Sequence, residues 1–197
     1  MMRAALIWLA LALPAMADGL PALHGVTGVA ANDVLNIRAA PDAGAAIVSV
    51  LPPGAADIEV VSLSSDGKWA LVNTGKASGY AALRFLKRQP APDWFSLAAP
   101  LRCSGTEPFW SLTMTPRRHA IYATPESETM LPLINRWSGA SHAPVVGLAT
   151  GDGGFISLTA AQCSDGMSDR AYGIAATLFL TGEDGPVTQT GCCTLIP

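Results

Sequence analysis

The segment Cys163-Ser164-Asp165-Gly166-Met167-Ser168-Asp169-Arg170 places one cysteine, two carboxylates and one arginine within eight residues. The other three cysteines are Cys103, Cys192 and Cys193, which lie toward the two ends of the same C-terminal half. If the four cysteines pair with one another, this segment becomes the point at which the C-terminal half of the chain is tied together.

The first residues have the pattern of a secretory signal. Arg3 supplies a positive charge, Ala4–Leu13 is an unbroken apolar run, and Ala15-Met16-Ala17 is a small-x-small cleavage site. The apolar run is roughly half of the about 20 residues that a membrane-spanning helix needs. We therefore expect residues 1–17 to be removed, although an uncleaved anchor is the alternative. The mature chain should begin at Asp18 as a soluble periplasmic or secreted protein.

An oxidising compartment allows four cysteines to form two disulfides. A bond between Cys192 and Cys193 would close a strained ring, and consecutive strand residues point to opposite faces. We therefore expect Cys103 to pair with one of them and Cys163 with the other, each bridge adding about 2–4 kcal/mol. The alternative is a Cys103–Cys163 bond beside a reducible Cys192–Cys193 pair, which would indicate redox work. No C-x-x-C pair suggests zinc, so we expect neither a metal nor a cofactor.

The composition favours an all-β protein. Half of the residues are hydrophobic and only 14% are charged, which supplies a core and argues against disorder. Apolar and polar residues alternate in short runs between turns that are rich in Gly and Pro. We expect a small open N-terminal barrel, then an antiparallel barrel or sandwich of roughly seven or eight strands. The net charge of −3 includes no basic field, which argues against nucleic-acid binding.

The chain divides at Gln89-Pro90-Ala91-Pro92-Asp93, where two prolines stiffen a linker. We expect one domain over residues 18–88, the linker over 89–93 and a second domain over 94–197. Four short motifs mark the first domain: Leu35-Asn36-Ile37-Arg38-x-x-Pro41, Leu51-Pro52-Pro53-Gly54, Gly67-Lys68-Trp69-Ala70-Leu71-Val72 and Gly79-Tyr80-Ala81. In order and spacing, this domain resembles the bacterial SH3-like family over about sixty residues, from about 26 to 88.

The resemblance implies a small open β barrel of the kind that exported bacterial proteins use to bind cell-wall peptides, glycans or proteins. The family usually has Gly-Trp where this chain has Gly79-Tyr80, which keeps an aromatic ring. We expect Arg38, Trp69 and Tyr80 near a groove, because aromatic rings stack on sugars and Arg binds carboxylates. The alternative, which the apolar neighbours of Trp69 favour, places Trp69 in the core and leaves Arg38 solvated.

The second domain carries three separated motifs. These are Cys103-x-Gly105-x-Glu107-Pro108-Phe109-Trp110, then Cys163–Arg170 followed by x-Tyr172, and finally Gly191-Cys192-Cys193. Together they resemble an uncharacterised family of exported bacterial proteins, sometimes described only as predicted membrane proteins. That resemblance implies no activity. Phe109 and Trp110 are expected in the core.

The polar residues of the second domain allow two interpretations. One takes Glu107, Asp165 and Asp169 as an acid/base set or as ligands for calcium, although the segment lacks the alternating oxygen ligands of a calcium loop. The interpretation that we favour is structural: Asp165, Ser168 and Asp169 bond to loop amides, and Arg170 reaches Glu107 across the domain. No G-x-S-x-G nucleophile setting occurs in the sequence.

These observations predict a non-enzymatic protein of the cell envelope. Its first domain is expected to bind peptidoglycan or an envelope protein, and its second to offer a disulfide-stabilised surface. One alternative is an inhibitor or sensor of an envelope hydrolase such as a lysozyme, which rests on architecture alone. The other is a hydrolase that uses Glu107, Asp165 and Asp169.

Overall fold

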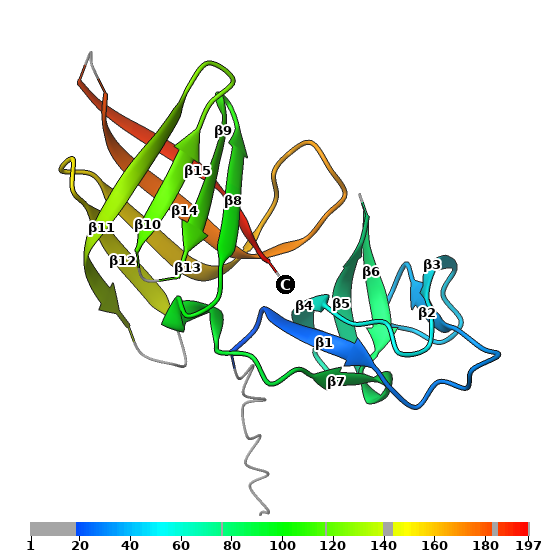
Figure 1. Ribbon diagram of the computed structural model, residues 1–197. Coiled ribbons are helices and arrows are strands. Elements are labelled where there is room, and N and C mark those ends of the chain that lie inside the picture. The colour runs from blue at the N-terminus through cyan, green and yellow to red at the C-terminus, as the bar shows by residue number, and fades with distance from the viewer. Residues whose placement is uncertain (1–18, 76, 117, 140–143, 183–184, 197) are drawn as a thin grey trace, which may run out of the picture.

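The structure is a computed structural model that describes residues 19–75, 77–116, 118–139, 144–182 and 185–196. The expected leader, residues 1–17, lies outside this part of the chain. The described residues form two antiparallel β-sheets that lie side by side (Figure 1), which confirms the all-β prediction. Among these residues, no helix has the length and apolar character needed to cross a membrane.

The described residues before the linker form a seven-stranded sheet in the order β3-β2-β6-β5-β4-β1-β7. One face covers a small apolar core, because alternate residues such as Leu35 and Ile37 point inward and are buried. The Asp66-Gly67 turn joins two neighbouring strands, and Gly67 adopts the positive φ of 68° that this turn requires. The elements are β1 (Ala22–Val26), β2 (Leu35–Arg38), β3 (Ile47–Leu51), β4 (Ile58–Leu63), β5 (Trp69–Thr74), β6 (Ala77–Ala82), the 3-10 helix η1 (Leu83–Phe85) and β7 (Leu86–Arg88).

The described part of the C-terminal half forms a closed barrel of eight strands. Each strand pairs with the next one along the chain, and the last strand closes the barrel against the first. The prediction of a barrel or a sandwich is therefore resolved in favour of a closed barrel, which leaves no free sheet edge along its paired length. The strands are β8 (Leu101–Thr106), β9 (Phe109–Thr115), β10 (His119–Ala123), β11 (Glu128–Ser138), β12 (Val145–Thr150), β13 (Phe155–Cys163), β14 (Tyr172–Gly182) and β15 (Gly185–Leu195).

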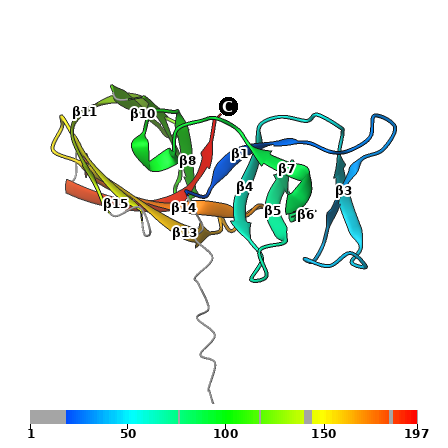
Figure 2. The same cartoon turned by 90° about the horizontal axis from the view of Figure 1, so that it is seen from below.

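One end of the barrel is covered by the 3-10 helix η2 (Trp94–Ser96). Figure 2 shows this short helix inside the ring of strands. Trp94 and Leu97 belong to the same buried cluster as the inward residues of the strands, and Trp94 is 1% exposed. The Trp94 Nε1–H donates to the carbonyl of Leu20 at 3.1 Å. The residues after the linker therefore contribute to the barrel core and also contact the start of the N-terminal half.

All four cysteines are described, and they form two disulfides, Cys103–Cys193 and Cys163–Cys192. Cys103 and Cys193 face each other across β8 and β15 within the barrel core. Cys192 points to the opposite face of β15 and meets Cys163 at the end of β13. The prediction that the two adjacent cysteines pair with different partners is confirmed.

The position of the Trp110 indole helps to explain why residues 105 and 191 are glycines. It is 4% exposed, as expected for a core residue, whereas its neighbour Phe109 is 55% exposed, so the core prediction for Phe109 is wrong. A Cβ at Gly105 would lie 2.6 Å from Cε2 of Trp110, and a Cβ at Gly191 would lie 2.6 Å from Cζ2. A side chain at either glycine would overlap both the indole and a backbone carbonyl, that of Thr190 next to Gly105 and that of Ser104 next to Gly191.

We predict that Gly191→Ala destabilises the protein by about 1–3 kcal/mol, the usual range for forcing extra volume into a packed core. The matched control is Gly139→Ala, because a Cβ at Gly139 meets its nearest neighbour at 3.5 Å. Urea unfolding of the oxidised protein measures both changes. Equal stability of the two variants would contradict the close packing of Gly191 against Ser104 and Trp110.

Candidate functional site

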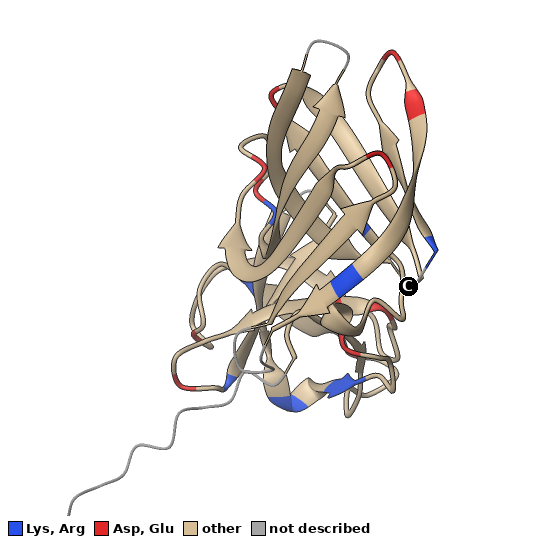
Figure 3. Cartoon of the chain, turned by 90° about the vertical axis from the view of Figure 1, so that its left-hand side faces the viewer, with Lys and Arg blue, Asp and Glu red and all other residues tan. Residues whose placement is uncertain are grey.

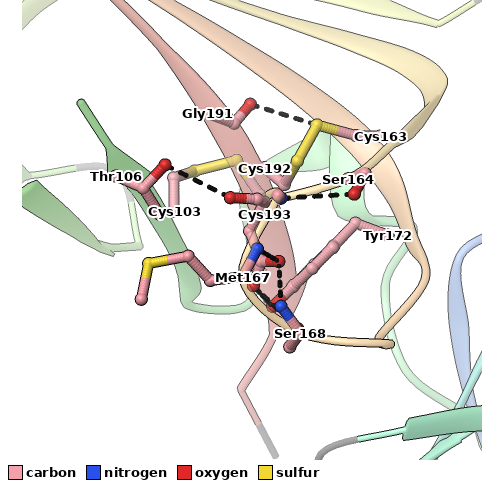
Figure 4. The surroundings of a disulfide bond; sticks show 12 residues. Cys103, Thr106, Cys163, Ser164, Met167, Ser168, Tyr172, Gly191, Cys192 and Cys193 are labelled. Carbon is pink, nitrogen blue, oxygen red and sulfur yellow. Dashed lines mark hydrogen bonds between the residues drawn. A yellow bond between two sulfur atoms is a disulfide. The ribbon is translucent and has the colours of Figure 1, made fainter.

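The segment between β13 and β14 is held in a fixed turn by Asp165. Figure 4 shows Met167, Ser168 and Tyr172 around this turn. One carboxylate oxygen of Asp165 accepts from the backbone N–H groups of Met167, at 3.0 Å, and Ser168, at 2.9 Å. The other accepts from the Ser168 hydroxyl at 2.8 Å and from the Tyr172 hydroxyl at 3.0 Å. The structural interpretation of Asp165 as an acceptor for loop amides therefore agrees with this geometry.

These contacts change the pKa values of Asp165 and of Tyr172. Burial raises the pKa of Asp165, but the four hydrogen bonds favour the carboxylate more strongly and lower the pKa to about 2. Burial, followed by the hydrogen bond to Asp165, raises the pKa of the Tyr172 phenol. Asp165 is therefore a carboxylate whose lone pairs are occupied by the turn itself, which does not suit a proton-transferring group at neutral pH.

The second half of this segment docks onto the N-terminal sheet. Asn73 donates to the carbonyl of Ala171 at 2.9 Å and accepts from its N–H at 3.1 Å. The Ser78 hydroxyl donates to the carbonyl of Asp169 at 3.0 Å. Ala77 forms a parallel bridge with Asp169. Residues 164–171, which we call the docking loop, therefore connect the barrel to the hairpin of strands β5 and β6.

Arg170 does not reach Glu107, so that part of the prediction is wrong. The Arg170 guanidinium donates to the carbonyl of Gly75 at 2.7 Å and lies 5.7 Å from the centre of the Tyr172 ring. Glu107 is exposed at the β8–β9 hairpin, and no ion pair joins it to Arg170 among the described residues. The reason is that Thr106 holds the first half of the docking loop, at Asp165, whereas the second half turns toward the N-terminal sheet.

Glu59 is a second polar contact between the two halves, which the sequence reasoning missed. It is only 7% exposed and accepts from the Thr194 hydroxyl at 2.5 Å and from the Leu195 N–H at 3.1 Å. Burial raises the pKa of Glu59, and the hydrogen bonds and the charge of Arg170 offset part of that shift. The only sequence signal was an acid between two apolar residues of a strand, Ile58 and Val60.

We predict that Asp165→Asn removes a pH-dependent contribution to stability. Because folding lowers the pKa of Asp165 from 3.8 to about 2, its contribution is present above pH 3.8 and is lost as the pH falls toward 2. The difference in unfolding free energy between wild type and variant should therefore shrink over that window, as measured by urea unfolding. Asp169→Asn, which removes an exposed carboxylate from the same loop, is the control for the loss of a charge. A constant difference for Asp165→Asn would contradict the assignment.

Glu59 should produce the opposite pH dependence. Its folded pKa lies above 4.5, so its contribution is greatest below pH 4.5 and is lost as the pH rises through the folded pKa. Wild type should therefore lose stability relative to Glu59→Gln as the pH rises from 4.5 through the folded pKa of Glu59. Glu128→Gln is the control, because Glu128 is exposed. A gain of wild-type stability over Glu59→Gln with rising pH would overturn this account.

The N-terminal sheet brings the other three predicted residues onto one face. Arg38 of β2 pairs with Tyr80 of β6, and Trp69 of β5 pairs with Ala82 of β6. Their strand neighbours Ile37 and Ala81 point into the core, so Arg38, Trp69 and Tyr80 point outward. The structure therefore places the three residues on the same outer face, on adjacent strands.

Trp69 is partly exposed and lies outside the buried cluster, so the prediction of a core position is wrong. It borders two hollows, of about 390 Å³ and 470 Å³, and Arg84 borders both as well. Arg38 lines the first hollow and donates to the carbonyl of Ala45 at 2.7 Å, so it is held in place rather than free in solvent. Tyr80 is not among the residues that line either hollow. We call the surface formed by Arg38, Trp69 and Arg84 the Trp69 groove.

The described residues contain no group of three or more His, Cys, Asp or Glu side chains that could hold a metal ion. Glu107 and Asp169 are exposed, and the carboxylate of Asp165 is occupied by its turn. The geometry therefore offers the three acids no shared reaction centre, and the Trp69 groove is the better candidate for a binding site.

Comparison with known proteins adds no relative: no family model, no curated protein and no solved structure matches this chain. The function must therefore be argued from the residues themselves.

Proposed function

We propose that this protein is a non-enzymatic component of the bacterial cell envelope, periplasmic or secreted. In this proposal the N-terminal sheet is an SH3-like module that binds cell-wall peptides through the Trp69 groove. Two disulfides support the location, because such bonds persist in oxidising compartments. The observation that carries the binding role is the position of Trp69, partly exposed between two hollows and flanked by arginines.

The chemistry of the groove suits a peptide with carboxylate groups. A guanidinium donates two parallel hydrogen bonds to a carboxylate, and an indole face covers apolar atoms beside it. Arg84 adds its charge at the same place, with its guanidinium 4.7 Å from the centre of the Phe85 ring. Peptidoglycan stem peptides combine free carboxylates with small apolar side chains, which matches this arrangement.

The test is co-sedimentation of the mature, oxidised protein with purified peptidoglycan. We predict that Trp69→Ala and Arg84→Ala each weaken binding about tenfold or more, the equivalent of about 1.4 kcal/mol, because residues at the centre of a site carry most of its energy. Arg102→Ala is the matched control, since Arg102 is exposed on the barrel and should bind as wild type. Wild-type binding by Trp69→Ala, or no sedimentation of the wild-type protein, would refute the proposal.

A second candidate is an inhibitor of an envelope hydrolase such as a lysozyme. The docking loop supports it: Asp165 holds the turn rigid while Met167 projects from it with 67% of its surface exposed. A preorganised loop loses little entropy when it enters a cleft. Inhibition of lysozyme by the wild-type protein, lost in Met167→Glu, would favour this candidate over the first.

A further inference from the structure

Three aromatic side chains form a row on the outside of the barrel, far along the chain from the Trp69 groove. Trp137 lies on β11, Phe155 on β13 and Phe179 on β14. The ring centres of Trp137 and Phe155 are 6.0 Å apart, and those of Phe155 and Phe179 are 6.4 Å apart. Their side chains are 54%, 37% and 47% exposed, respectively. We call this row the aromatic strip.

The register of the strands explains how the rings meet. Phe155 pairs directly with Phe179 across β13 and β14, whereas Trp137 pairs with Gly147 of the intervening strand β12. A Cβ at Gly147 would lie 2.7 Å from Cζ of Phe155. The Phe155 ring therefore lies over Gly147, and the absence of a side chain there lets it extend across β12 toward Trp137.

Most of the strands around the aromatic strip carry no charged residue, and Arg136, beside Trp137 on β11, donates to the carbonyl of Ser96. Strands β12, β13, β14 and β15 contain no Asp, Glu, Lys, Arg or His. Figure 3 shows the charged residues mainly in the loops, with most of the barrel strands that face the viewer uncoloured. The outward residues next to the rings include the hydroxyls of Ser157, Thr177 and Thr188, which the strand pairing places beside Phe155 and Phe179. Exposed aromatic rings of this kind often mark a binding surface, and here their neighbours are neutral hydroxyl groups rather than charged side chains.

We propose that the aromatic strip binds an uncharged polysaccharide. A sugar ring presents C–H groups on its faces, which stack on aromatic rings, and hydroxyls on its edge, which bond to Ser and Thr. A ligand with phosphates or carboxylates would find no cationic partner on these four strands. An anionic membrane surface attracts basic residues, which these strands also lack. The strip thus differs from the Trp69 groove, whose arginines suit an anionic peptide.

The probe is a soluble hexamer of β-1,4-linked N-acetylglucosamine, which carries no peptide and no charge, so its binding does not depend on the proposed role of the Trp69 groove. Titration of the full mature, oxidised protein should change its tryptophan fluorescence and saturate. Calorimetry should show that Trp137→Ala and Phe179→Ala each weaken binding at least tenfold. Phe109→Ala is the matched control, because Phe109 is an exposed phenylalanine outside the strip. Raising NaCl from low to high concentration should leave the affinity unchanged.

Phe155→Leu tests the aromatic ring itself, because leucine keeps most of the apolar volume. This variant should have the melting temperature of the wild-type protein and should bind the hexamer at least tenfold more weakly. Absence of saturable binding would overturn the proposal, and so would wild-type affinity in the strip variants. The proposal would also be overturned if Phe109→Ala lost as much affinity for the hexamer as the strip variants, or if the affinity of the wild-type protein fell as NaCl rose. The proposal also fails if the strip variants abolish only self-association in sedimentation experiments, or only binding to neutral lipid vesicles, while the hexamer does not bind.

Discussion

The Cys163–Cys192 bridge determines where the chain leaves the barrel and where it returns. Cys163 ends β13, and its bond to β15 holds the start of the docking loop against the last strand. From that fixed point, the four hydrogen bonds of Asp165 set the turn, and the chain then passes Asp169 and Arg170 to the N-terminal sheet. Without the bridge, the loop would lose the anchor that aims it at β5 and β6. The bridge therefore acts on the relation between the two halves as well as on the barrel.

The contact between the halves is polar, and its two carboxylates have opposite effects. Asp165 is stabilised as an anion by the turn around it, whereas Glu59 is buried at a cost that Thr194 and Leu195 only partly offset. Because a buried carboxylate is costly to leave unpaired, Glu59 favours the arrangement in which Thr194 and Leu195 donate to it. Glu59 thus serves to align β4 with the end of β15. The paired hydrogen bonds of Asn73 with Ala171 serve the same purpose at the docking loop.

Local rules were enough to predict much of this molecule. The alternation of apolar residues predicted the strands, and the opposite directions of Cys192 and Cys193 predicted that they pair with different partners, though not which partner each takes. The partner of Arg170 could not be predicted, because Gly75 lies 95 residues away and only the packing of the two sheets brings it near. The exposure of Trp69 has a similar cause: the pattern shows which residues share a face, but not which face another part of the chain covers. The aromatic strip could not be predicted either, because it depends on which residues pair across β11–β14, and the sequence alone does not give this strand register.

The hydrogen bonds of the docking loop and of Glu59 predict that the N-terminal sheet and the barrel tumble as one unit. Nitrogen-15 relaxation of the mature, oxidised protein tests it most directly, because each backbone amide reports the rotational correlation time of the body to which it belongs. The account predicts one common correlation time for strands β1–β7 and β8–β15, with the amides of residues 165–171 as ordered as those of the strands. A shorter correlation time for the N-terminal sheet than for the barrel would contradict it.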